Sequence, residues 1–202
     1  MPGGTSTDLE GARSHDSPDP VRSHGAPRMP LVLETERLFL REMALPDLDF
    51  VAAMLGDSDV MRFYPRPLSR IEARGWIKRQ LARYSEHGHG LWLAVERTTG
   101  RPVGQAGLLT QEVEGALEPE IGYLLHRPFW HHGFATEAGL AIRRHAFHSL
   151  DKPHVISLIR AVNLPSQAVA RRLGMHPVRR VVFRGLPHLL FSIAREAAPG
   201  GA

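Results

Sequence analysis

The sequence contains no cysteine in its 202 residues. This absence excludes disulfides, thiolate nucleophiles and cysteine-based metal sites, and it agrees with a reducing compartment. The sequence also lacks an apolar run near the roughly 20 residues that a membrane-spanning helix needs. Its first residues contain no apolar segment of the kind that a signal peptide carries. Together these absences predict a cytoplasmic protein without a membrane partner.

Lysine is scarce, since only Lys78 and Lys152 occur. The net charge of +4 therefore rests on arginine side chains, which are scattered along the chain instead of clustered. A basic chain is compatible with a nucleic-acid partner, but no RNA-recognition signature is present. Ordinary solvated arginines explain the charge equally well. We therefore expect no nucleic-acid partner, and a nucleic-acid-binding module stays as a competing hypothesis.

Composition divides the chain into a tail and one domain. Residues 1–30 are rich in Gly, Ser, Pro, Asp and His and show no apolar periodicity. Such a segment buries too little apolar surface to offset the entropy of ordering it, which predicts a disordered tail. Residues 31–196 have the apolar periodicity expected of one folded domain. Residues 197–202 are expected to be frayed.

Hydrophobic periodicity and turn residues predict about seven strands and four helices. Ser69 with Glu72 forms a capping-box pattern at the start of one helix. Strands interrupted by helices in this order favour a mixed α/β (α+β) fold with one central twisted sheet. The predicted strands are 31–42, 91–95, 103–111, 117–125, 154–160, 177–183 and 188–195. The predicted helices are 46–56, 69–87, one that opens at the loop 131–136 and ends near 150, and 163–173.

The stretch from Trp130 to Ala135 lies between an extended apolar segment and the start of a helix. The first N–H groups of a helix have no partner inside it, and the helix dipole puts partial positive charge there. Gly133 lets a ligand approach the backbone and is able to adopt a positive φ. Ala135 keeps the first turn thin. This combination predicts an anion site that binds a pyrophosphate through main-chain groups, without a lysine.

The stretch Phe129–Ala138 reads Phe-Trp-His-His-Gly-Phe-Ala-Thr-Glu-Ala and resembles the acyl-CoA pyrophosphate loop of the GNAT-superfamily N-acetyltransferases. Trp130 stands where many members have Gln or Arg. An aromatic residue there is typical of the branch that includes ribosomal-protein N-terminal acetyltransferases. A second stretch, Asn163–Met175, resembles the Asn-x-x-Ser…Leu-Gly-Phe/Met segment of the same family. The resemblance covers about residues 31–195.

The resemblance implies a mostly antiparallel sheet with a CoA site in its middle. Strands four and five, at 117–125 and 154–160, are expected to be parallel and to splay apart so that they admit the pantetheine arm. Acetyl-CoA is the implied co-substrate, and no metal is expected. The implied pyrophosphate contacts are the backbone groups of His131, His132, Gly133, Phe134, Ala135 and Thr136. The implied pantetheine contacts are Leu124, Leu125 and His126, with Asn163 and Ser166 near the sulfur.

The implied reaction is direct transfer of an acetyl group to a primary amine, either a protein N-terminal amine or a small-molecule amine. The amine must lose a proton before it attacks the thioester. Glu120 is the candidate general base because it shares a strand face with Gly122 and Leu124. A solvated carboxylate at the edge of a strand is the alternative interpretation of Glu120. For Asn163 and Ser166, helix N-capping is the alternative.

The proton donor to the departing thiolate is the point at which the chain departs from the family. Many members carry a tyrosine in the helix that corresponds to 163–173, and this sequence has none there. Ser166 or ordered water is the expected replacement. Tyr123 is a further candidate, although its strand face is predicted to be opposite to that of Glu120. The missing tyrosine also supports a competing hypothesis, a non-catalytic CoA-binding regulatory domain.

The acceptor side is the part that the sequence describes least. In the family, the region of Met61, Phe63 and Tyr64 borders the acceptor cleft, but packing under a loop explains Met61 and Phe63 equally well. His188 lies near a strand start that borders the same cleft, so it is a possible substrate contact. The chain is expected to be a monomer or a homodimer.

Overall fold

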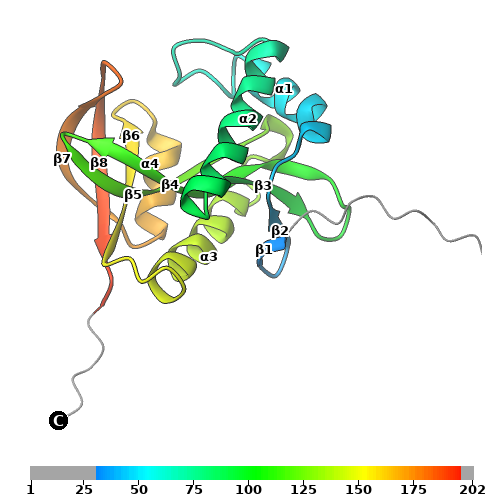
Figure 1. Ribbon diagram of the computed structural model, residues 1–202. Coiled ribbons are helices and arrows are strands. Elements are labelled where there is room, and N and C mark those ends of the chain that lie inside the picture. Colours follow the sequence, from blue (N-terminus) through cyan, green and yellow to red (C-terminus); the bar gives the residue numbers. More distant parts are fainter. Residues whose placement is uncertain (1–30, 197–202) are drawn as a thin grey trace, which may run out of the picture.

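The structure, a computed structural model, describes residues 31–196 as one eight-stranded sheet with helices on both faces (Figure 1). The tail expected at 1–30 and the frayed end expected at 197–202 lie outside the described residues. The strands are β1 (Leu31–Glu34), β2 (Leu38–Arg41), β3 (Leu91–Glu96), β4 (Pro102–Val113), β5 (Ala116–Leu125), β6 (His154–Arg160), β7 (His176–Phe183) and β8 (Leu186–Ala194). The helices are α1 (Leu48–Gly56), α2 (Arg70–His87), α3 (Phe134–His148) and α4 (Leu164–Arg172), with 3₁₀ turns η1 (Leu45–Asp47) and η2 (Arg127–Phe129). None of these described helices is both long and apolar enough to cross a bilayer.

The sheet is mixed and mostly antiparallel, as predicted. Its order is β1-β2-β3-β4-β5-β6-β8-β7. Every neighbouring pair is antiparallel except β5 and β6, which are parallel. The single parallel pair therefore lies inside the sheet, where each of its strands also has an antiparallel neighbour.

The prediction of one strand over 31–42 is wrong, because the chain reverses at residues 35–37. Glu34 pairs with Phe39 across the resulting β1–β2 hairpin. Thr35 holds the turn, since its Oγ1 accepts a hydrogen bond from the N–H of Leu38 at 2.9 Å. No glycine or proline marks this turn in the sequence, so the extended pattern of the flanking strands concealed it. The sheet consequently has eight strands instead of about seven.

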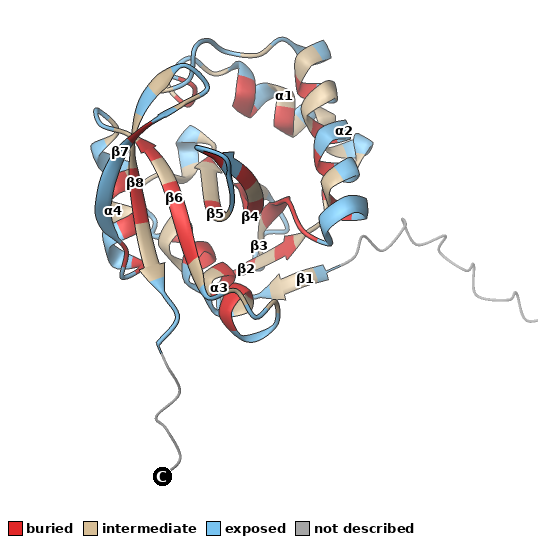
Figure 2. Ribbon diagram, turned by 60° about the vertical axis from the view of Figure 1, so that its left-hand side comes forward, coloured by how far each residue is buried: buried red, intermediate tan, exposed pale blue. Residues whose placement is uncertain are grey.

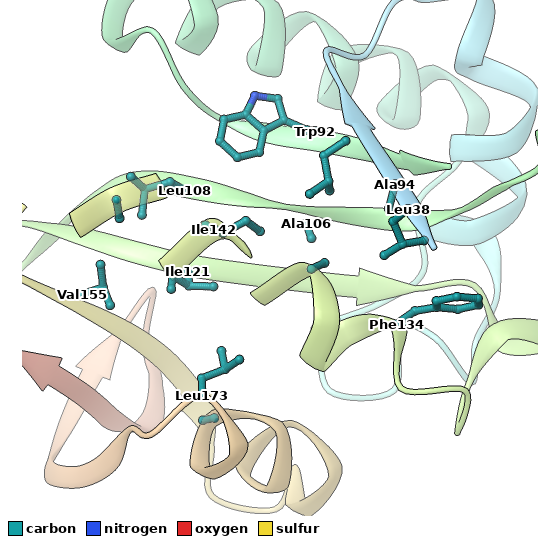
Figure 3. Packing of buried hydrophobic residues seen from close by; sticks show 14 of the residues in the cluster. Leu38, Trp92, Ala94, Ala106, Leu108, Ile121, Phe134, Ile142, Val155 and Leu173 are labelled. Atoms are coloured by element: carbon teal, nitrogen blue, oxygen red, sulfur yellow. The ribbon is translucent and has the colours of Figure 1, made fainter. Parts of the chain in front are cut away.

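Helices cover the sheet in two layers. Helices α1 and α2 lie on one face, and α3 and α4 lie on the other (Figure 2). β3 shows how the strands serve both layers. Its Trp92 packs in the cluster that contains Ile142 of α3 (Figure 3). Its Leu93 packs in a separate cluster with Ile77 of α2. The prediction that this strand is buried on both faces is confirmed.

Two glycines bring β3 and β5 unusually close to β4. A Cβ atom on Gly107 would lie 1.9 Å from the carbonyl oxygen of Gly90, and one on Gly104 would lie 2.5 Å from that of Leu124. No side chain fits at those distances, which confirms the close backbone approach predicted from the two glycines.

The parallel strands β5 and β6 pair only briefly and then separate, as predicted. Their register contains one pair, Glu120 with Ile156. Two side chains bridge the strands where backbone pairing ends. The hydroxyl of Ser157 donates to the carbonyl of Ile121 at 2.7 Å, and the N–H of Leu158 donates to the Glu120 carboxylate at 3.2 Å. The splay is thus fixed by side-chain hydrogen bonds, and backbone groups beyond it are left without strand partners.

Candidate active site

A cavity of about 420 Å³ opens beside the N-terminus of α3. In the loop before the helix, His131 and Gly133 have φ values of 65° and 82°. These left-handed positions turn neighbouring N–H groups toward one concavity, which is the geometry of an anion-binding nest. The N–H of Glu137 donates to the Gly133 carbonyl at 3.0 Å, so the N–H groups of the three residues before Glu137 have no partner inside the helix. The lining residues from this stretch are Trp130, His131, Gly133, Phe134, Ala135 and Thr136.

Arg37, in the β1–β2 turn, fastens this loop to the sheet. Its Nη1 donates to the carbonyl of His132 at 3.0 Å, and its Nη2 lies 2.6 Å from the Glu137 carboxylate. Glu137 also accepts from the hydroxyl of Thr35 at 2.6 Å and from the backbone N–H of Arg37 at 2.8 Å. Burial alone would raise the pKa of Glu137, but the hydrogen bonds from Thr35 and Arg37 outweigh it and lower that pKa. The turn that the sequence concealed therefore positions the anion loop.

Beyond the splay, β5 presents a backbone edge to the cavity. The N–H of His126 donates to a β4 carbonyl at 2.9 Å, and the β4–β5 register is continuous. Backbone groups in an antiparallel ladder alternate in direction, so those of Leu124 and His126 point toward β4. Those of Tyr123 and Leu125 point toward the splay. The carbonyl of Leu125 already accepts from the indole N–H of Trp130 at 2.8 Å.

A second cavity of about 290 Å³ lies against α2, and Glu120 lines it. The Glu120 side chain is buried, with only 9% of the residue exposed, so the alternative of a solvated carboxylate at a strand edge is wrong. Its oxygens accept from Nε2 of Gln111 at 2.8 Å and from the N–H of Leu158 at 3.2 Å. Burial raises the pKa of Glu120, and these two hydrogen bonds oppose that rise. A carboxylate whose pKa is raised in this way is a better proton acceptor near neutral pH.

The two cavities meet at a shared wall. The Tyr123 hydroxyl donates to the carbonyl of Ser166 at 2.8 Å and so spans from β5 to the first turn of α4. The side-chain oxygen of Asn163 accepts from the N–H of Ser166 at 3.2 Å, which is the helix cap considered for this residue. Asn163 also lines both cavities, so the cap does not remove it from the cavity wall. The residues that line both cavities are Phe63, Tyr64, Tyr123, Leu124, Asn163 and Ser166.

Three of the residues singled out from the sequence lie away from both cavities. His132 gives its carbonyl to Arg37, and the ring of His126 packs edge-on against Phe50 with centroids 5.7 Å apart. Met61 is buried in the core beneath α1 and α2, as the packing interpretation expected. By contrast, Phe63, Tyr64 and His188 line the second cavity.

The adjacent histidines His131 and His132 do not take part in a cluster of metal ligands. Within residues 31–196, no three His, Asp or Glu side chains lie close enough to hold a metal ion. His131 lines the first cavity, whereas the His132 ring packs on Phe134 with centroids 6.0 Å apart.

Several functional residues escaped the sequence analysis. Gln111 on β4 and Ser157 on β6 are buried polar residues, and Ser157 interrupts the apolar run Val155–Ile159, which is a usable signal for a buried polar role. Glu137 stands in the first turn of α3, where an acidic residue normally complements the helix dipole. Arg37 carries no such signal, because its role depends on a hairpin that only the tertiary structure reveals.

Comparisons with known proteins agree with this geometry. The sequence model of one family, described as an acetyltransferase (GNAT) domain, matches residues 37–176. The uncharacterized protein YkkB of Bacillus subtilis is 32% identical over 145 residues, which cover 71% of this chain and 84% of YkkB. The crystal structure of an acetyltransferase from Agrobacterium tumefaciens superposes with a TM-score of 0.70 at 28% identity, covering 86% of this chain and 99% of that one.

A third comparison concerns the fold alone. The ribosomal L7/L12 α-N-protein acetyltransferase RimL, solved in complex with coenzyme A, superposes with a TM-score of 0.68 over 82% of this chain and 98% of its own. The two sequences are only 15% identical. The similarity therefore concerns the arrangement of strands and helices and does not transfer an acceptor.

Proposed function

Because this chain belongs to the GNAT acetyltransferase family, we propose that it transfers the acetyl group of acetyl-CoA directly to a primary amine. The observation that carries the proposal is the meeting of two cavities at one wall, with the buried Glu120 carboxylate in the second cavity. The first cavity, beside the start of α3, suits the donor and is called the donor cavity below. The second cavity, which Glu120 lines, suits the acceptor and is called the acceptor cavity. Acetyl-CoA would supply an acetyl group already activated as a thioester.

The donor cavity has features that fit CoA. The helix start and the left-handed loop offer main-chain donors to a pyrophosphate. Arg62 and Arg172 line the same cavity and add positive charge for phosphate groups. The backbone edge at Tyr123 and Leu125 offers hydrogen bonds to the amides of pantetheine, in the place of a strand partner.

The acceptor cavity supplies the proton chemistry. An ammonium group must lose a proton before its nitrogen attacks a carbonyl carbon. Within residues 31–196, Glu120 is the only carboxylate that lines this cavity, and its raised pKa suits it to take that proton directly or through a water molecule. Ser166 and Tyr123 line the wall shared by the two cavities, which supports them as candidates to give a proton to the departing sulfur. Burial raises the pKa of Tyr123, and the Glu120 charge adds to that rise, so the phenol stays protonated and able to donate.

The test is release of free CoA thiol from acetyl-CoA in the presence of a panel of amines and short peptides. The N-acetylated product is identified by mass spectrometry. We expect thiol release that depends on both substrates and that falls in Glu120→Gln. If acetyl-CoA neither binds nor is consumed with any amine, the proposal fails.

The missing tyrosine in α4 favours one alternative, a CoA-binding regulatory domain without turnover. That alternative predicts normal acetyl-CoA binding, no transfer to any amine, and no change in binding in Glu120→Gln. The same assay with a parallel binding measurement separates the two functions.

A further inference from the structure

Two arginines in the acceptor cavity have no acidic partner. Arg160, at the end of β6, and Arg184, in the β7–β8 turn, both line this cavity. Among the described residues, neither has a carboxylate within 4.0 Å. The Arg184 guanidinium packs over an aromatic face, 5.0 Å from the centroid of Phe183. Guanidinium groups that line a cavity without a protein partner are suited to bind an anion.

These two arginines are separate from the positive charge that would serve CoA. Arg62 and Arg172 line the donor cavity and do not line the acceptor cavity. Arg160 and Arg184 line the acceptor cavity and do not line the donor cavity. The phosphates of CoA therefore do not account for Arg160 and Arg184.

Of the two arginines, only Arg160 is separated from Glu120 along the strands. Burial raises the pKa of Glu120, and the charge of Arg184 opposes that rise, so Arg184 lies nearer to Glu120. Glu120 pairs with Ile156, and Arg160 lies four residues further along β6, roughly 13 Å away at about 3.3 Å per residue. The rest of the cavity lining is mainly apolar and aromatic, and includes Phe63, Trp76, Leu109 and Leu158. With one carboxylate and two guanidinium groups, the lining carries net positive charge. A simple cationic amine would be attracted by Glu120 and repelled by the arginines.

Building on the proposed acetyl transfer, we infer that the acceptor is a small amine that also carries an anionic group, with the nitrogen directed toward Glu120 and the anion toward Arg160 and Arg184. A carboxylate a few carbon atoms from the amine is the simplest such group. The cavity volume of about 290 Å³ is near the lower limit, about 300 Å³, of common ligand sites. That size favours a molecule comparable to an amino acid over a long peptide segment.

Matched pairs of amines test this inference. Glycine, β-alanine, γ-aminobutyrate and ε-aminohexanoate are compared with their own amides, which keep the amine and remove the negative charge. We expect at least one acid to exceed its amide by about tenfold or more in kcat/KM, because an arginine–carboxylate contact contributes that much. The chain length that gives the largest ratio reports the spacing between Glu120 and the arginines.

Charge-removing variants assign the preference to the two arginines. Arg160→Gln and Arg184→Gln should lower the ratio of acid to amide by about tenfold. Arg180→Gln is the matched control, because Arg180 lies on β7, is exposed and does not line the cavity. Acetyl-CoA affinity should stay unchanged in all three variants, which separates a loss of acceptor selectivity from a loss of folding.

Each outcome decides between the acceptor class and the reaction. If amides or neutral peptides are acetylated as well as the acids, or if the arginine variants leave the ratio unchanged, the acceptor class is wrong and acetyl transfer stands. If no amine is acetylated, calorimetric binding of the same acids to the CoA complex becomes the readout. Binding that is lost in Arg160→Gln then supports an anion site, and absence of such binding overturns it.

Discussion

At the scale of single residues, Glu120 has a structural role and is also the proposed general base. One of its oxygens replaces the backbone acceptor that Leu158 loses where β5 and β6 separate. The same carboxylate lines the acceptor cavity with its pKa raised by burial. The splay and the candidate base therefore depend on one side chain, and a useful variant must preserve its shape while removing its charge.

Glu120→Gln is that variant. We expect kcat/KM to fall about 10²- to 10⁴-fold, the usual contribution of a general base, while acetyl-CoA binds as before. Gln keeps an oxygen for the N–H of Leu158, so the fold is preserved. Glu118→Gln on the same strand is the control, because Glu118 does not line the cavity and pairs with His154 at 2.5 Å. Equal kcat/KM values for Glu120→Gln and the wild type would remove Glu120 from the mechanism.

The raised pKa of Glu120 also predicts the pH dependence of activity and stability. The base is active when ionised, so kcat/KM should rise with pH through a value above the ordinary 4.5. The folded state holds this proton more tightly than the unfolded state does. Ionisation of Glu120 therefore lowers the free energy of unfolding as pH rises through this range. Denaturation of wild type and Glu120→Gln across pH should show this slope in the wild type and a smaller slope in the variant.

Gly133 supplies the conformation of the anion loop. Its φ of 82° is unfavourable for any residue with a Cβ, and a Cβ there would lie 3.4 Å from Nη2 of Arg37. We expect Gly133→Ala to reduce stability by about 1–2 kcal/mol and to weaken acetyl-CoA binding. Gly115→Ala is the matched control, since Gly115 has a φ of 85° and open space around it. Both variants should lower the melting temperature, and only Gly133→Ala should raise the Kd for acetyl-CoA.

At the scale of elements, the β1–β2 turn and α3 act as one unit. Glu137 accepts hydrogen bonds from Thr35 and Arg37, and Arg37 holds the loop through the carbonyl of His132. Burial would raise the pKa of Glu137, but the hydrogen bonds from Thr35 and Arg37 lower it. The stability that these hydrogen bonds contribute is present above the unfolded-state pKa of about 4.3, and it is lost as pH falls through the folded-state pKa. The anion site therefore depends on residues about 100 positions earlier in the chain.

Glu137→Gln tests this dependence. The variant loses the charge that Arg37 binds, so we expect a loss of about 1–2 kcal/mol in stability and weaker acetyl-CoA binding. Glu114→Gln is the comparison, because Glu114 forms an exposed pair with Arg179 that should contribute only about 0–1 kcal/mol. Chemical denaturation and calorimetry measure the two effects. Unchanged acetyl-CoA affinity in Glu137→Gln would show that the loop keeps its shape without this anchor.

Local features of the helices and loops could be predicted from the sequence, whereas contacts between distant elements could not. The capping box at Ser69 and Glu72 is present, with the N–H of Ser69 donating to Glu72 at 2.8 Å, because capping depends on neighbours in the chain. The loop around Gly133 was equally readable, since a strand, a glycine and a helix start are local signals. The β1–β2 turn was not, because a threonine holds it in place of glycine or proline. The roles of Arg37 and Gln111 depend on contacts between distant strands, which local patterns do not encode.

At the scale of the whole molecule, the sheet separates two sites and joins them at one place. The donor cavity faces the start of α3, and the acceptor cavity faces α2. Their shared wall includes Tyr123 and Leu124 of β5, near the point where β5 and β6 part inside the sheet. The family resemblance predicted the splay between β5 and β6. That His126 and His132 do not line the cavities became clear only from the strand register and the side-chain packing.

This arrangement predicts the kinetic order of the reaction. Two substrates that meet at a shared wall are expected to react directly in a ternary complex, so initial rates should give intersecting double-reciprocal lines. An acetyl-enzyme route needs a nucleophile, and the sequence has no cysteine. The Ser166 hydroxyl is at the wall, but no base is hydrogen-bonded to it among the described residues. Ser166→Ala should therefore keep the intersecting pattern, and any fall in kcat reports loss of a proton donor to the departing sulfur instead of loss of a nucleophile. Parallel lines, together with an acetylated protein formed from acetyl-CoA alone, would contradict direct transfer.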